Sequence, residues 1–175
     1  MTINGRIQVY TGNGKGKTTA AFGLALRAAG RGYKVYIAQF VKGMHYAELD
    51  SIRKFLSDFV TIKQYGRGCF IHGKPVQEDI DSARVGLDEV TGILASGAYD
   101  IVILDEANIA VYFELFSVEA LLHAIAARQP HTEVVVTGRY AHEKLCDIAD
   151  LVTEMKEIKH YYETEKLQAR EGIEF

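Results

Sequence analysis

A glycine-rich stretch near the N-terminus carries the residue types that bind phosphate. It reads "TGNGKGKTT" and ends in a Gly-Lys-Thr sequence. Glycines let successive backbone N–H groups point inward and form an anion-binding nest at the start of a helix. A lysine there would bind phosphate oxygens, and the threonine hydroxyl would bind Mg²⁺. The stretch predicts a nucleotide site formed by Gly12, Asn13, Gly14, Lys15, Gly16, Lys17, Thr18 and Thr19.

One residue departs from the general pattern of such loops, because Thr11 stands where the first glycine is usual. The alternative interpretation is a glycine-rich turn that only connects a strand to a helix. The flanking segments favour a phosphate-binding loop, since a strand is expected over residues 6–11 and a helix follows over residues 16–30. Position 11 ends the strand and need not line the anion nest.

Two acids follow another strand-like segment, "DIVILDE". In open α/β sheets, ligands bind in the crevice at the carboxyl ends of the strands. Asp105 and Glu106 are therefore expected, together with Thr18, to hold Mg²⁺ directly or through water. The predicted catalytic set is Lys17, Thr18 and Glu106. The alternative is that the two acids merely open a loop.

Two arginines are candidates for contacts with the nucleotide. Arg139 follows the strand-like segment "VVVTG" and could bind phosphate or ribose with two parallel hydrogen bonds. Arg27 lies in the first expected helix. A surface ion pair for Arg139 and a solvated side chain for Arg27 are the alternatives. The sequence offers no serine or cysteine in the setting of an activated nucleophile.

Apolar, β-branched segments alternate with helical patterns along the whole sequence. Helices are expected over residues 16–30, 79–95, 117–128 and 141–150. Continuous apolar strands between helices indicate a mostly parallel sheet with helices on both faces, which is a three-layer α/β fold in a single domain over residues 1–175. The expected strands cover residues 6–11, 34–40, 59–65, 100–105, 132–138 and, more weakly, 151–158.

Composition narrows the class further. The chain has 175 residues, a formal charge of −3 and a 48% apolar fraction, which fits a globular domain and gives no general basic field for nucleic acid. Its two cysteines lack the spacing of a zinc site or a disulfide framework. With no apolar run of about 18 residues and no signal peptide, a soluble cytoplasmic protein is expected, without nucleic-acid or membrane partners. The residues alone leave an NTPase, a kinase and an ATP-dependent alkyl-transfer enzyme open.

Several longer stretches are similar to the P-loop corrinoid adenosyltransferases, the cob(I)alamin adenosyltransferase family of cobalamin synthesis and salvage. The resemblance spans residues 6–175 and is carried by "TGNGKGKTTAAFGLALRAAGRGYKVYIAQFVKG", "DIVILDE", "VVVTGRYAHEKLCDIADLVTEMKEIKH" and "KLQAREGIEF". It implies a homodimer with a RecA-like P-loop NTPase fold that binds MgATP in a reversed orientation. The implied reaction transfers the 5′-deoxyadenosyl group to the cobalt of a reduced corrinoid and releases triphosphate, with a transient flavoprotein reductant as a further partner.

The resemblance also implies roles for particular residues. Thr18 and Glu106 would lie at the metal, and Arg27 and Arg139 would contact the nucleotide. Phe70 and His72 are the candidates on the corrinoid side, although the tryptophan expected there is absent from the sequence. The N-terminal helix that covers the corrinoid in some members has no counterpart in this sequence.

Two other functions stay open from the sequence. The first is a P-loop NTPase or nucleoside kinase that cleaves the terminal phosphate; RecA-like thymidine kinases usually carry a four-cysteine zinc ribbon, which two cysteines cannot form. The second is a non-catalytic protein that binds ATP and a partner. The products distinguish the enzymes, since adenosyl transfer yields triphosphate and phosphate cleavage yields ADP.

Overall fold

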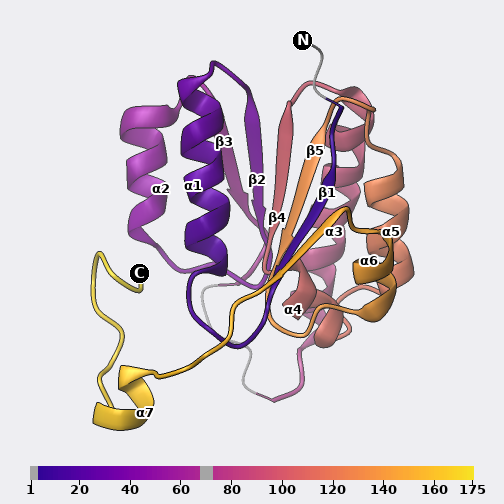
Figure 1. Ribbon diagram of the computed structural model, residues 1–175. Coiled ribbons are helices and arrows are strands. Elements are labelled where there is room, and N and C mark those ends of the chain that lie inside the picture. The colour runs from indigo at the N-terminus through magenta and orange to yellow at the C-terminus, as the bar shows by residue number, and fades with distance from the viewer. Residues whose placement is uncertain (1–3, 68–72) are drawn as a thin grey trace.

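The computed structural model describes residues 4–67 and 73–175 and has an α/β architecture (Figure 1). Six parallel strands form one sheet in the order β3-β2-β4-β5-β1-β6. The first strand therefore lies near one edge, next to the last strand of the sequence. The strands are β1 (Ile7–Thr11), β2 (Val35–Gln39), β3 (Val60–Gln64), β4 (Ile101–Asp105), β5 (Glu133–Thr137) and β6 (Leu151–Glu154).

Helices cover both faces of this sheet (Figure 1). One face packs against α1 and the turn of π-helix η1, and the other packs against α3, α4, α5 and α6. Successive side chains of a strand point to opposite faces, and this divides the core into two clusters. Ile37 of β2 packs on the side of α1, and its neighbours Tyr36 and Ala38 pack on the side of α3. The helices are α1 (Lys17–Gly30), α2 (Ala47–Ser51), η1 (Ile52–Leu56), α3 (Gln77–Ser96), α4 (Ala107–Tyr112), α5 (Val118–Ala126), α6 (Glu143–Ile148) and α7 (Tyr161–Glu165).

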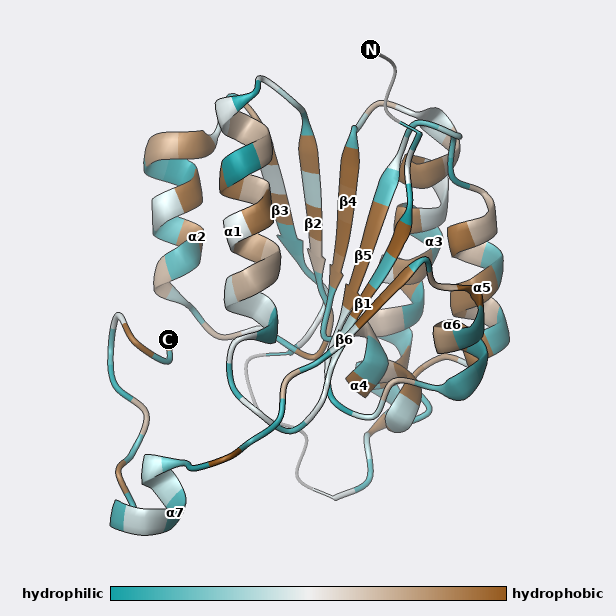
Figure 2. Cartoon of the chain, in the orientation of Figure 1, coloured by the Kyte–Doolittle hydropathy of each residue, from teal (hydrophilic) through white to brown (hydrophobic). Residues whose placement is uncertain are grey.

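The central strands are mostly apolar because both of their faces are covered. Every residue of β2 and β4 is buried, and Figure 2 shows β2, β4 and β5 as the most hydrophobic strands of the sheet. The edge strand β6 differs, since all four of its residues are exposed. Among the described residues, no helix has the length and apolar character needed to cross a membrane.

The predicted α/β class, with a parallel sheet and helices on both faces, is confirmed, and the strand order is consistent with a RecA-like fold. Three short helical elements were not expected: the α2–η1 segment, α4 and α7. The last strand ends at Glu154, shorter than the expected 151–158, because the carbonyl oxygen of Met155 accepts from Gly14 N of the glycine-rich loop and no longer from β1. That the whole protein is one domain stays a prediction.

Candidate active site

The glycine-rich loop joins β1 to α1 and encloses the Lys17 ammonium group. Gly12 and Gly16 have positive φ values of 95° and 118°, which favour glycine. Lys17 Nζ donates hydrogen bonds to the carbonyl oxygens of Gly12 at 2.7 Å and Gly14 at 2.8 Å. The loop thus holds a buried cation at the N-terminus of α1. Asn13 and Lys15 of the loop and Thr19 of α1 are exposed.

Several charged groups converge on Lys17. Burial lowers the pKa of Lys17 below its usual value, while Glu106 and Asp105 act in the opposite direction and Arg139 adds to the lowering. Both acids and Arg139 therefore act electrostatically on Lys17, and a common nucleotide site for these four residues stays a prediction. An anion bound there would relieve the repulsion between Lys17 and Arg139.

Asp105, the last residue of β4, is fully buried and accepts hydrogen bonds from four side chains. Its Oδ1 atom accepts from Thr18 Oγ1 and Thr137 Oγ1, both at 2.8 Å. Its Oδ2 atom accepts from Lys42 Nζ at 2.9 Å and from Gln39 Nε2 at 3.2 Å. Asp105 therefore connects the glycine-rich loop to the carboxyl ends of β2 and β5.

Lys42 is a site residue that the sequence analysis did not single out. Its Nζ atom lies 2.9 Å from Asp105 Oδ2 and 3.4 Å from Thr18 Oγ1, and 3.9 Å from Glu48. Burial alone would lower the pKa of Lys42, but the charge and hydrogen bond of Asp105 outweigh it and raise the pKa. The signal was present in "QFVKG", since Lys42 follows the strand β2, yet only the pairing of β2 with β4 brings it to Asp105.

Glu106 begins α4 in a left-handed conformation with φ of 61°. Its backbone N–H donates to Thr137 Oγ1 at 3.0 Å, which fixes the turn between strand and helix. Burial and the neighbouring Asp105 raise the pKa of the Glu106 carboxyl, while Lys42 and Lys17 act against that rise. A Cβ atom at Gly138 would lie 3.2 Å from Glu106 Oε2, so this glycine leaves room for the carboxylate.

The donor set fits Mg²⁺. Thr18, Asp105 and Glu106 supply hard oxygen ligands, and the ammonium of Lys42 already contacts both Thr18 and Asp105 as a cation. Over residues 4–67 and 73–175, no cluster of three or more His, Cys, Asp or Glu side chains is present. Because Mg²⁺ is usually held by one or two carboxylates together with substrate phosphates and water, two acids suffice.

The remaining predicted residues are placed as follows. Arg139 is exposed, and its charge acts on Lys17 and Glu106. Arg27 lies ten residues beyond Lys17 along α1, about 15 Å along the helix axis, and its charge acts on Tyr10. The structure does not bring Arg27 to the loop, and a nucleotide contact by it stays a prediction. Phe70 and His72 lie outside the described residues.

The fold defines an α/β protein in which the glycine-rich loop, two acids and two lysines lie close together at the carboxyl ends of the parallel strands. The chain matches the family described as ATP:corrinoid adenosyltransferase BtuR/CobO/CobP over residues 3–175. It is 35% identical to the corrinoid adenosyltransferase of Sinorhizobium sp over 173 residues, which covers 98% of this chain and 80% of that protein.

Two further relatives give the same result. Identity is 35% over 171 residues with the corrinoid adenosyltransferase of Pseudomonas aeruginosa, covering 98% of this chain and 84% of the relative. Identity is 34% over 172 residues with the corrinoid adenosyltransferase CobA of Salmonella typhimurium, covering 98% of this chain and 86% of the relative. The chain belongs to the ATP:corrinoid adenosyltransferase family. The predicted family is confirmed, and with it the prediction of a transferase that moves the adenosyl group of ATP to a corrinoid.

Proposed function

We propose that the glycine-rich loop binds the triphosphate of MgATP as the leaving group of this transfer. The observation that carries the proposal is the Lys17 ammonium, which is held inside the loop by two loop carbonyls at 2.7 and 2.8 Å. Those carbonyl contacts are weak competitors for a cation compared with a charged phosphate. Triphosphate oxygens would draw the ammonium and the N–H groups of the loop toward themselves.

In the proposed reaction, Co(I) of the reduced corrinoid attacks C5′ of ATP with its electron pair. A Co–C5′ bond forms, the C5′–O bond breaks, and the oxygen leaves with its electron pair as part of triphosphate. The protein needs no nucleophile or general base for this step. Its contributions are the alignment of C5′ with cobalt and the stabilisation of the charge on the leaving group.

Mg²⁺ would neutralise part of the triphosphate charge when it is bound. Thr18 and Glu106 are the proposed ligands, with Asp105 acting directly or through water. Asp105 already holds the Thr18 hydroxyl at 2.8 Å, so it orients this ligand before any metal arrives. Arg139 supplies a further positive charge near Lys17 and Glu106, and we propose that it contacts the nucleotide.

Lys42 is proposed as a second lysine of the triphosphate site. Its ammonium pairs with Asp105 and contacts Thr18 from the side of β2. If Thr18 and Asp105 held Mg²⁺, the charge of the metal would repel the Lys42 ammonium, and the bound phosphates would offer it another anionic partner. Lys42 would then act with Lys17 on the departing group.

The partners and location beyond this reaction are also proposals. A homodimer is supported by the exposed apolar residues of the edge strand β6, where Leu151 is 47% exposed and Val152 is 44% exposed. A flavoprotein would deliver the electron that forms Co(I), and the cytoplasm is the proposed location. Phe70 and His72 stay the candidates for the corrinoid side.

The test compares the wild-type protein with Lys17→Met, each given chemically reduced cobalamin and MgATP in the dark. The wild type should produce the absorbance spectrum of adenosylated cobalamin, and ³¹P NMR should show triphosphate in equal amount. Lys17→Met should produce little of either. A wild type that releases ADP and phosphate instead would overturn the proposal in favour of phosphate cleavage.

A further inference from the structure

The segment that follows β6 forms one wall of the glycine-rich loop. Met155 donates its N–H to Thr11 O at 2.8 Å and accepts from Gly14 N at 2.7 Å. The two backbones lie so close that a Cβ atom at Gly12 would be 2.4 Å from Met155 O, and one at Gly14 would be 2.7 Å from it. The segment beyond β6 therefore begins its course in direct contact with the proposed triphosphate loop.

A cavity of about 350 Å³ lies between the outer side of the loop and this segment. It is lined by residues 14–15 and 156–161. Three lysines (Lys15, Lys156 and Lys159) and one acid (Glu157) line it, so the cavity favours anions. Beyond the cavity, α7 and the C-terminal stretch lie apart from the layers of the core, and the backbone turns back toward the loop (Figure 1).

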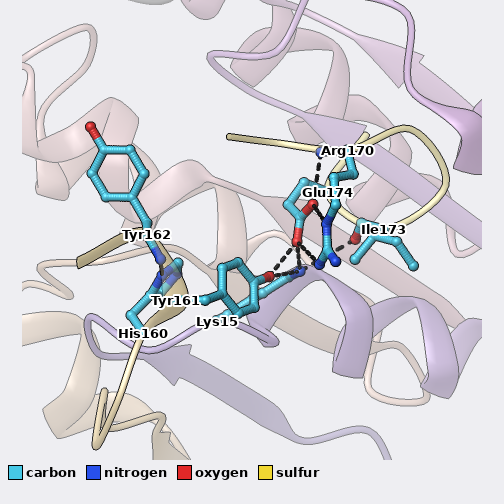
Figure 3. Close-up of polar contacts among 7 residues, drawn as sticks. All are labelled: Lys15, His160, Tyr161, Tyr162, Arg170, Ile173 and Glu174. Atoms are coloured by element: carbon cyan, nitrogen blue, oxygen red, sulfur yellow. Dashed lines mark hydrogen bonds and ion pairs between the residues drawn. The ribbon is translucent and has the colours of Figure 1, made fainter. Parts of the chain in front are cut away.

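The returning C-terminal stretch places the Glu174 carboxylate on the Lys15 ammonium of the loop (Figure 3). Lys15 Nζ lies 2.5 Å from Glu174 Oε1 and 2.9 Å from the hydroxyl of Tyr161. The Tyr161 hydroxyl also donates to Glu174, and the Arg170 guanidinium packs over the Tyr161 ring at 5.1 Å from its centre. Lys15 thus ends in a contact set made wholly by residues of the C-terminal segment.

Glu174 is held in place by the backbone and side chain of Arg170. Its Oε2 atom accepts from Arg170 N at 2.8 Å and from Arg170 Nε at 3.3 Å, and Oε1 accepts from Arg170 Nη2 at 3.2 Å. Arg170, Lys15 and Tyr161 together hold the pKa of Glu174 well below its usual value. The carboxylate is therefore a fixed anion beside a loop that is built for anions.

We propose that Glu174 is a positioning residue for Lys15, which it holds until a polyphosphate in the loop takes the ammonium from it. The C-terminal segment 159–175 then opens when the triphosphate binds and returns to Lys15 when the triphosphate leaves. This inference rests on the proposed function, because it requires that the loop bind triphosphate. It adds a residue from the far end of the sequence to the phosphate site.

The first experiment measures the dissociation constant of inorganic tripolyphosphate by calorimetry, without ATP or corrinoid. Removing a competing carboxylate should tighten binding in Glu174→Gln by about two- to five-fold, the range of a partly exposed ion pair. The matched control is Glu171→Gln in the same segment, because within the described ranges Glu171 makes no ion pair, and its affinity should equal that of the wild type. In a Lys15→Met background the effect of Glu174→Gln should disappear.

The second readout follows the segment itself by limited trypsin cleavage after Lys166 and Arg170. Tripolyphosphate should speed cleavage in the wild type toward the rate of ligand-free Glu174→Gln. Binding that is unchanged or weaker in Glu174→Gln, or protection of the segment by tripolyphosphate, would overturn the inference alone. A wild type that does not bind tripolyphosphate, or binds it no better than Lys17→Met, would overturn the proposed function and this inference with it.

Discussion

The two lysines of the glycine-rich loop lie in very different surroundings. Lys17 is buried, with 7% of its surface exposed, and it is held by loop carbonyls close to Asp105 and Glu106. Lys15 has 42% of its side chain exposed and is held by Glu174 and Tyr161 of the C-terminal segment. The inner lysine is fixed by the loop and the sheet, and the outer lysine is held by a separate segment of the protein.

Because of this difference, Lys17 at the inner end of the loop and Lys15 at its outer end should contribute very different free energies. A charge removed from water acts strongly on its neighbours, and its loss leaves other buried groups without a partner. A partly exposed ion pair contributes far less and is screened by salt. We therefore expect catalysis and protein stability to depend on Lys17 and its buried neighbours at the inner end. The contact of Lys15 with Glu174 at the outer end should adjust how readily phosphate enters the loop.

The largest effect should come from exchanging the two lysines for methionine one at a time. Lys17→Met should lower kcat/KM by about 100- to 1,000-fold, the usual cost of losing one donor to a developing negative charge. Lys15→Met should lower it by less than about five-fold, because its contribution is that of a partly exposed charge. Steady-state assays of adenosylcobalamin formation measure both, and equal losses would remove the distinction between the two ends.

A smaller but still large effect concerns the ion pair of Lys42 with Asp105, whose side chains are 14% and 0% exposed. Lys42→Met should lower the free energy of unfolding by about 3 kcal/mol, because it leaves a buried carboxylate without its cation. Urea unfolding measures this. The control Lys63→Met breaks the exposed pair with Glu89 and should cost less than about 1 kcal/mol. Adding Asp105→Asn to Lys42→Met should recover part of the lost free energy of unfolding. If nothing is recovered, the unpaired Asp105 carboxylate is not the cause of the loss.

Replacing Gly14 of the loop by alanine tests how tightly the segment that follows β6 packs against the loop. Gly14→Ala would place a Cβ atom 2.7 Å from Met155 O, so it should destabilise the protein by about 1–3 kcal/mol and weaken tripolyphosphate binding. Gly23→Ala in the exposed part of α1 meets nothing within 4 Å and should stabilise the protein by up to about 1 kcal/mol. Thermal unfolding compares the two, and a harmless Gly14→Ala would mean that the crossing segment can move aside.

The smallest expected effect is a salt dependence at the outer end. The gain in tripolyphosphate affinity in Glu174→Gln should shrink toward no difference from the wild type as NaCl rises from about 0.05 to about 0.5 M, because the Debye length falls below the size of the contact set, to about 4 Å. The loss in Lys17→Met should persist over the same range. A Glu174 effect that does not respond to salt would mean that the carboxylate acts by shaping the segment.

The sequence predicted most of the fold because the central strands are apolar on both faces. Stretches such as "DIVILD" are typical of a covered parallel sheet, and all six expected strands are present. The short helices α4 and α7, of six and five residues, were not predicted, whereas α6, which also has six residues, was expected over the longer range 141–150. Whether such short helices form depends on their tertiary contacts.

The sequence also predicted the part of the site that lies in local motifs. Lys17, Thr18, Asp105 and Glu106 follow directly from the loop and the acids at the end of a strand. Lys42 was missed because its partner Asp105 is 63 residues away and belongs to it only through the pairing of β2 with β4. Glu174 was missed for the same reason, since 159 residues separate it from Lys15.

The most direct test of the central claim uses ATP that carries ¹⁸O in the bridge between C5′ and the α-phosphorus. The protein is given this ATP with Mg²⁺ and reduced cobalamin in the dark, and the triphosphate is analysed by mass spectrometry. If the loop holds triphosphate as the leaving group, every molecule of triphosphate should carry the label. Unlabelled triphosphate, or label retained in ADP beside free phosphate, would contradict the account.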